Sequence, residues 1–115
     1  MQPKSTADVA SILKTVKEKG SKFAVRAGGH NPNPGVNGVN SPGVVIDLRN
    51  LTSMSLDGDG VLHVGSGAKW GEIYTYLEEH GRVAIGGRQK DVGVGGYMLG
   101  GLSAPIISEA SPSPC

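Results

Sequence analysis

The amino-acid sequence predicts an α+β fold made of two helices and several short strands. The helices are expected at residues 6–19 and 70–80, where apolar residues recur at the helical spacing i, i+3, i+4, i+7. Short apolar runs of strand length lie between and after them, and glycine-rich loops follow two of these runs. The length of 115 residues suits one domain of typical size.

The first predicted helix begins after Ser5, which can cap the first turn, and Asp8 stands in the reciprocal position of a capping box. Its apolar stripe is formed by Val9, Ile12, Leu13 and Val16. Charged residues fall largely off that stripe and predict a solvated face, and Gly20 is suited to end the helix. A short strand is expected next, at residues 22–26.

A glycine-rich segment follows this strand, with the sequence Val-Arg-Ala-Gly-Gly-His-Asn-Pro-Asn-Pro-Gly at residues 25–35. Glycine lets a ligand approach the main chain closely, and successive backbone N–H groups in such a turn can bind an anion, typically a phosphate. Pro32 and Pro34 fix φ and lack a donor, so we expect an irregular loop through residue 42. Taken alone, the segment is as consistent with a plain connector as with a binding loop.

The middle of the chain predicts a buried strand and a hairpin. Residues 43–48 carry apolar side chains on both faces of an extended chain, which is typical of a buried strand. Residues 54–56 and 61–64 are expected to pair, because two Asp-Gly pairs supply a turn between them. Asp57 and Asp59 are therefore interpreted as turn formers, and His63 as a residue on the strand surface.

The second predicted helix carries its apolar stripe at Trp70, Ile73, Tyr74 and Leu77. Trp70 is expected to anchor this helix on a sheet, and a last short strand is expected at residues 83–85. A second glycine-rich loop follows at residues 86–101, with the sequence Gly-Gly-Arg-Gln-Lys-Asp-Val-Gly-Val-Gly-Gly-Tyr-Met-Leu-Gly-Gly. Two such loops, each after a short apolar run, favour a ligand held from two sides.

Composition excludes several classes of function. A net charge of +1 does not provide the basic surface that nucleic acid requires. No apolar run approaches the roughly 18 residues of a membrane span, and the N-terminus has no signal-peptide core. No His/Cys spacing suggests a metal, and motifs of P-loop, Rossmann and Gly-x-Ser-x-Gly sites are absent. A single cysteine, Cys115, excludes an internal disulfide and assigns no compartment.

The motifs are more specific in combination than any one of them is alone. They run in the order Val-Arg-x-Gly-Gly-His-Asn-Pro, Gly-Val-Val-Ile-Asp-Leu, Val-Gly-x-Gly-Ala-x-Trp, Gly-Gly-Arg and Val-Gly-Val-Gly-Gly-x-x-Leu-Gly-Gly. This series resembles the PCMH-type FAD-binding domain of the vanillyl-alcohol oxidase family, and in particular the berberine-bridge-enzyme-like oxidoreductases. The resemblance covers residues 3–101 and implies FAD as the cofactor.

The resemblance implies that both glycine loops contact FAD. In the family, the main chain of the first loop holds the FAD diphosphate, which agrees with a nearly neutral chain. The positions that match FAD contacts are Arg26, Ala27, Gly28, Gly29, His30, Asn31, Gly87, Val92, Gly93, Gly95, Gly96 and Leu99. Tyr97 receives only a weak assignment, and no position of the chain is assigned a catalytic role.

The resemblance gives His30 a special position. Many family members attach the 8α-methyl group of the isoalloxazine covalently through a histidine there, and a neutral imidazole is a suitable nucleophile. The alternative is a hydrogen-bonding loop residue with noncovalent FAD. Some members form a second link through a cysteine, but this chain has Gln89 at that position, so a doubly attached flavin is not expected.

The family pattern is lost after residue 101, where Leu102 replaces the usual third glycine. We therefore expect a partial FAD-binding domain at residues 1–101 and a divergent, flexible tail at residues 102–115. The family's substrate domain lies C-terminal to all of these motifs. The expected function is the FAD-binding portion of an oxidoreductase, inactive alone, whose complete homologue transfers a hydride from a small-molecule donor such as an alcohol or sugar. The alternative is a noncatalytic, flavin-free remnant that serves as a small scaffold or interaction module.

Overall fold

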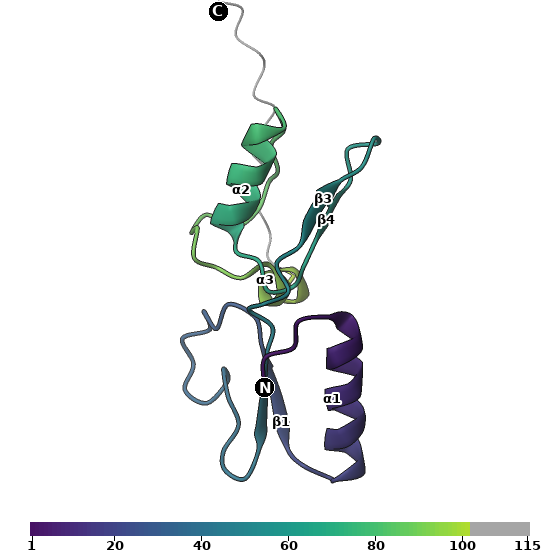
Figure 1. Cartoon of the computed structure of the whole chain (residues 1–115). Coiled ribbons are helices and arrows are strands. Elements are labelled where there is room, and N and C mark those ends of the chain that lie inside the picture. The colour runs from purple at the N-terminus through teal and green to yellow at the C-terminus, as the bar shows by residue number, and fades with distance from the viewer. Residues whose placement is uncertain (102–115) are drawn as a thin grey trace, which may run out of the picture.

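The computed structural model describes residues 1–101, and the predicted tail at residues 102–115 lies outside them. The described part has an α+β fold, as the sequence predicts, and Figure 1 shows the order of its elements. The elements are α1 (Thr6–Glu18), β1 (Phe23–Arg26), β2 (Val44–Asp47), β3 (Met54–Leu56), β4 (Leu62–Val64), α2 (Trp70–Glu79) and α3 (Val94–Leu99).

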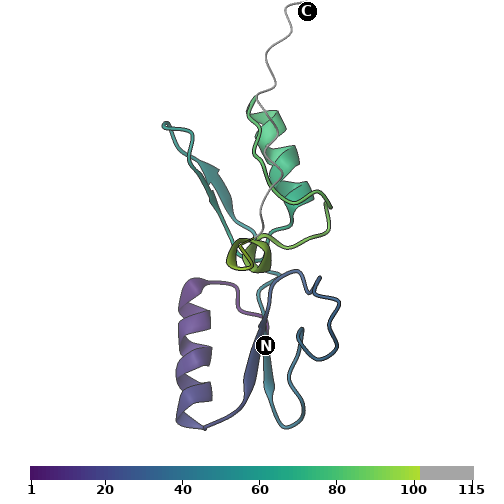
Figure 2. The same cartoon turned by 180° about the vertical axis from the view of Figure 1, so that it is seen from behind.

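The first half of the chain forms a helix beside a parallel pair of strands. β1 and β2 pair in register from Phe23 opposite Val44 to Arg26 opposite Asp47. Figures 1 and 2 both show α1 running alongside this pair. Ile46 is completely buried. Because the two strands are parallel, both end at the same edge, and the first glycine loop starts there.

The ends of α1 confirm the capping predictions. The Ser5 hydroxyl accepts a hydrogen bond from the Asp8 backbone N–H at 3.1 Å, and the Asp8 carboxylate accepts one from the Ser5 N–H at 3.0 Å. Gly20 follows the helix with φ of 59°, a conformation that glycine adopts without strain. The sequence thus predicts correctly how α1 is capped at its N-terminus and where it ends.

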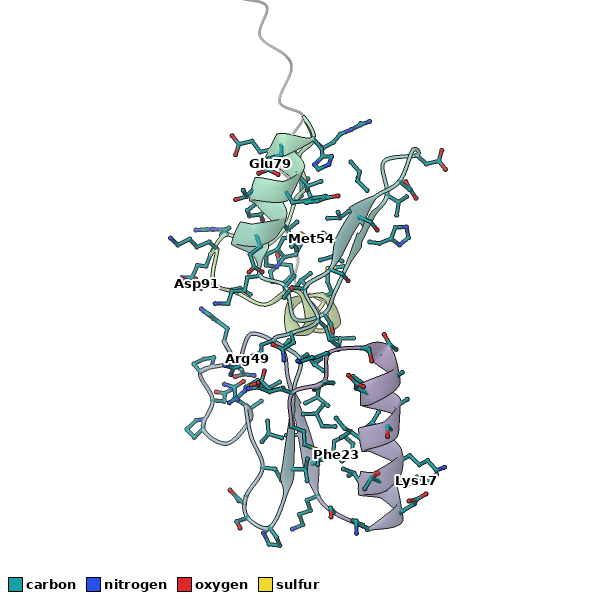
Figure 3. The ribbon with its side chains drawn as sticks, viewed as in Figure 1. Lys17, Phe23, Arg49, Met54, Glu79 and Asp91 are labelled. Carbon is teal, nitrogen blue, oxygen red and sulfur yellow. The ribbon has the colours of Figure 1, made fainter. Side chains whose placement is uncertain are left out.

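The second half contains the main apolar cluster, where α2 packs against the β3–β4 hairpin. Its buried members are Ala68, Trp70, Ile73, Leu77 and Val94. Hairpin residues, including Met54, pack against this cluster (Figure 3). Trp70 therefore anchors α2 as predicted. In Figures 1 and 2, α3 lies between this half and the first half.

The hairpin turn confirms the interpretation of its polar residues. The Asp57 carboxylate accepts backbone hydrogen bonds from Asp59 at 3.1 Å and from Val61 at 2.8 Å, so it closes the turn. The His63 side chain is 66% exposed, with its Nε2 atom 3.5 Å from Asp57 Oδ2. Among residues 1–101, no helix has both the length and the apolar character needed to cross a membrane.

Two predictions about the C-terminal part of the fold are wrong. Residues 83–85 form no strand: no other described strand pairs with them, and Val83 is 97% exposed. The predicted pair of helices is also incomplete, because α3 forms within the second glycine loop. Glycine disfavours helices in isolation, but burial of Val94 against the apolar cluster offsets that cost over one short segment.

Candidate functional site

A pocket of about 850 Å³ lies between the two glycine loops. Its first wall consists of the end of β1 and the loop that follows, and its second wall consists of the segment that leads into α3 and part of α3 itself. The lining residues are Val25, Arg26, Ala27, Gly28, Gly29, His30, Asn31, Pro32, Val36, Asn37, Gly87, Arg88, Gln89, Val92, Gly93, Gly96, Tyr97 and Gly100. The structure therefore joins two motifs that are about sixty residues apart in the sequence.

The first glycine loop presents its main chain to this pocket. Among the described residues, none accepts a hydrogen bond from the backbone N–H of Gly28, Gly29 or His30. Gly29 has φ of 66°, which lets the chain turn sharply here. Downstream, the Asn31 carbonyl accepts a hydrogen bond from the Asn37 side chain at 2.6 Å, which braces the loop. Exposed donors on a turned main chain suit an anion.

The two loops touch where Gly28 meets Gly93. A Cβ atom added to Gly28 would lie 2.6 Å from the backbone nitrogen of Gly93 and 2.8 Å from its Cα atom. Such distances are too short for any side chain, so close approach of the two main chains requires glycine at Gly28. Both residues line the pocket, so this contact joins its two walls.

The buried Trp70 and the half-buried Tyr74 of α2 hold the second loop. Gly86 and Gly87 lie against the Trp70 ring, and a Cβ on Gly87 would lie 2.5 Å from Trp70 Cδ1. The Tyr74 hydroxyl donates a hydrogen bond of 2.7 Å to the Gly87 carbonyl. Burial raises the pKa of the Tyr74 phenol, which keeps it protonated as a donor. Tyr97 of α3 meets Trp70 edge to face, with ring centroids 5.1 Å apart.

The charges around the pocket favour an anionic ligand. Arg26 and Arg88 line it, as does His30, and no Asp or Glu is among its lining residues. Apolar side chains such as Val92, together with the Tyr97 ring, supply surface for an uncharged part of the ligand. The pocket can thus accept a molecule that combines phosphate with ring systems.

A buried carboxylate organises the edge where β1 and β2 end. Asp47 is 3% exposed, and its Oδ2 atom lies 2.7 Å from Nη2 of both Arg26 and Arg49. The hydrogen bond from Arg49 is the main cause that holds the pKa of Asp47 far below its usual range, with Arg26 adding to it against the effect of burial. Figure 3 labels Arg49 near the first glycine loop. The sequence pattern places Asp47 in a buried strand and predicts no role for its side chain.

The pocket brings together most of the residues that the sequence predicts to contact FAD. All of them line it except Gly95 and Leu99. Gly95 packs instead against Ser66 and Ala27, and Leu99 is 91% exposed on α3. Tyr97, which received a weak assignment, does line the pocket. Contact with FAD itself stays a prediction for each of these positions.

Several lining residues were not predicted. Arg88 directly follows the Gly-Gly pair, so its position in the motif was the available signal. Val36 and Asn37 lie in the loop after the proline residues, where no local pattern indicates which side chains turn inward. These positions depend on how the loop folds back.

The fold and the pocket define a class: an α+β domain with a pocket between two glycine loops, suited to a phosphate-bearing ligand. Residues 1–110 match the family described as FAD binding domain, and the chain belongs to that family. FAD is accordingly the cofactor that this class of domain binds.

Individual relatives agree with this assignment. The chain is 46% identical over 99 residues to the FAD-dependent monooxygenase macF of Penicillium terrestre, covering 85% of this chain and 19% of that protein. Glucooligosaccharide oxidase from Acremonium strictum, described with a 6-S-cysteinyl, 8α-N1-histidyl FAD, superposes with a TM-score of 0.76 at 28% identity, covering 86% and 21% of the two chains.

BBE-like 1 from Physcomitrella patens superposes with a TM-score of 0.75 at 25% identity, covering 85% of this chain and 22% of that one. The resemblance to berberine-bridge-enzyme-like flavoproteins and the PCMH-type fold are thus confirmed. The chain spans about a fifth of the length of the curated relatives that it matches.

Proposed function

We propose that the pocket between the two glycine loops is the FAD site of this chain and that residues 1–101 act as the FAD-binding portion of an oxidoreductase. The observation that carries the proposal is that the backbone N–H groups of Gly28, Gly29 and His30 have no acceptor among the described residues and belong to residues that line a pocket without carboxylates. Such groups can hold a diphosphate without a strongly basic chain.

The residues present fit this cofactor. The contact between Gly28 and Gly93 leaves the main chain, rather than side chains, as the surface that meets the ligand. Arg26 and Arg88 add positive charge near the diphosphate, and Tyr97 and Val92 add apolar surface for ring systems. Every site residue predicted from the sequence, including Gly95 and Leu99, keeps its proposed role in or beside this site.

His30 is the proposed point of covalent attachment. It lies on the pocket wall directly after the two glycines, and its side chain is exposed enough to meet a ligand. Attachment through the imidazole nitrogen requires the neutral form of the ring. Gln89 also lines the pocket and has no nucleophilic atom, so we propose a single link rather than a double one.

When bound, FAD supplies the site with a hydride acceptor. We propose that the complete protein uses it to oxidise a small-molecule donor such as an alcohol or a sugar. Within the described residues, no carboxylate lines the pocket to take a proton from such a donor. The 115-residue chain is therefore expected to bind the cofactor without turnover.

The direct test is to purify the chain after expression with FAD and record its visible spectrum and intact mass. A yellow protein that gains the mass of one FAD and keeps its colour in the pellet after acid precipitation supports covalent attachment. His30→Ala should then abolish the gain in mass while leaving noncovalent binding. His80→Ala is the matched control, because His80 lies at the end of α2 and does not line the pocket.

Other results of the same experiment distinguish the remaining hypotheses about the cofactor. Flavin released by acid contradicts the covalent link and supports FAD binding. A folded, colourless protein that does not bind FAD contradicts the proposed function. That result would favour the flavin-free interaction module, which the strongly exposed apolar side chains of Val83 and Leu99 also suit.

A further inference from the structure

We propose that Asp47 is a positioning residue of the first glycine loop and acts on it through Arg26. This inference rests on the proposed function, because the loop is the part of the pocket expected to hold the FAD diphosphate. It assigns a role to a buried acidic residue that is not among the lining residues of the pocket.

The first step is the contact between the ends of two strands. Arg26 is the last residue of β1 and stands opposite Asp47, the last residue of β2, in the parallel register. Arg26 donates two hydrogen bonds to Asp47 Oδ2, from Nε at 3.2 Å and from Nη2 at 2.7 Å. Because two nitrogen atoms of the planar guanidinium bind the same carboxylate oxygen, the orientation of the Arg26 side chain is fixed.

The second step leads from Arg26 to the loop. Gly29 lies over the aliphatic part of Arg26: a Cβ added to Gly29 would be 3.1 Å from Arg26 Cδ and 3.5 Å from Cγ. At this point the loop takes its turn, with φ of 66° at Gly29. The Arg26 stem therefore forms the support on which the turned main chain rests, and Asp47 fixes that stem.

The third step concerns Arg49, which binds the same carboxylate from outside the pocket between the glycine loops. Its Nη2 lies 2.7 Å from Asp47 Oδ2, its side chain is 57% exposed, and it does not line the pocket. Arg49 contributes mainly to the charge balance of a desolvated carboxylate. Arg26 has both the contact with Asp47 and the contact with Gly29, so the path to the loop runs through Arg26.

The test compares Asp47→Asn with wild type by backbone ¹⁵N relaxation, without flavin. The order parameters of the backbone N–H groups at residues 27–31 should fall from about 0.85 to below about 0.6, while those in the middle of α2 stay unchanged. Asp57→Asn is the matched control, because it removes a carboxylate that also accepts backbone hydrogen bonds, at a turn outside the pocket. Unchanged order parameters at residues 27–31 in folded Asp47→Asn overturn the proposal.

A second pair of variants decides the matter if Asp47→Asn does not fold. Arg26→Lys keeps the positive charge and loses the forked contact, so it should lower the order parameters in the same loop. Arg49→Gln also removes a partner of Asp47 but leaves Arg26 in place, so it should leave the loop unchanged. Equal effects of these two variants contradict a path through Arg26.

Flavin binding is measured separately on the same proteins. Asp47→Asn should weaken FAD binding about tenfold and leave riboflavin binding unchanged, because riboflavin lacks the diphosphate. Equal weakening of both ligands would assign Asp47 a merely structural role. If wild type binds no FAD, the proposed function fails, and the order parameters still decide whether Asp47 positions the loop.

Discussion

At the scale of single residues, glycine has two different roles in this chain. Gly20 and Gly29 take positive φ values, so they are needed for backbone conformation. Gly28 is needed for space, because its Cα lies against the main chain of Gly93. The motif in the sequence predicts that both kinds of glycine matter, but it does not distinguish them, since the contact between Gly28 and Gly93 exists only in the folded chain.

Asp47 illustrates the limit of local patterns. Its motif, Val-Val-Ile-Asp-Leu, predicts the buried strand. Its partner beside the glycine loop is Arg26, which lies 21 residues earlier in the sequence. No helical or strand periodicity links positions so far apart. The parallel register of β1 and β2 creates the pair, and the sequence alone does not specify that register.

The same carboxylate leads to a prediction about acid stability. The pKa of Asp47 is lowered on folding, so its contribution to stability is complete above the unfolded pKa near 4 and is lost as the pH falls toward the folded value. Between pH 5 and pH 2, wild type should therefore lose about 2 kcal/mol more unfolding free energy than Asp47→Asn. Urea unfolding at a series of pH values measures this difference.

Two other acidic residues also affect stability at low pH, and they do so equally in wild type and variant. The pKa values of Asp8 and Asp57 are also lowered, each chiefly by a backbone hydrogen bond. Both are unchanged in the variant, so their effects cancel in the comparison. Identical pH dependence of wild type and Asp47→Asn would show that the pairing of Asp47 with its two arginine partners adds nothing to the free energy of unfolding.

At the scale of elements, capping and periodicity account for both long helices. The Ser5–Asp8 capping box and the stripe from Trp70 to Leu77 were visible in the sequence. α3 was not, because its glycines oppose helix formation, and packing of Val94 and Tyr97 against the apolar cluster compensates only in the folded chain. The expected strand at residues 83–85 failed for a related reason, since a strand needs a partner and none is present in the described part.

The support of the second loop by α2 gives another prediction. Tyr74→Phe removes the hydrogen bond from the phenol to the Gly87 carbonyl and should lower the unfolding free energy by about 1 kcal/mol. Because Gly87 lines the pocket, FAD binding should weaken a few-fold. Thermal unfolding and a flavin titration measure the two effects.

Tyr76→Phe is the matched control for that variant. Tyr76 lies on the same helix and stacks on His80, and its hydroxyl has no hydrogen-bond partner among the described residues. It should change neither stability nor FAD binding. If both variants behave alike, the hydroxyl of Tyr74 has no special part in holding the loop.

At the scale of the whole molecule, the site depends on the contact between two halves. The first half contributes the loop after β1, and the second contributes the loop supported by α2. The sequence predicts both loops and the kind of ligand they suit. It does not predict which side chains line the space between them, such as Arg88 and Asn37, because that depends on how the halves meet.

The central claim is that FAD binds between the two glycine loops, and amide NMR spectra of the labelled chain with and without FAD test it most directly. We expect signals from residues 28–31 and 87–96 to shift on addition of FAD, while those of the hairpin turn at residues 57–60 stay in place. FAD that leaves the signals of both glycine loops unmoved would contradict the account.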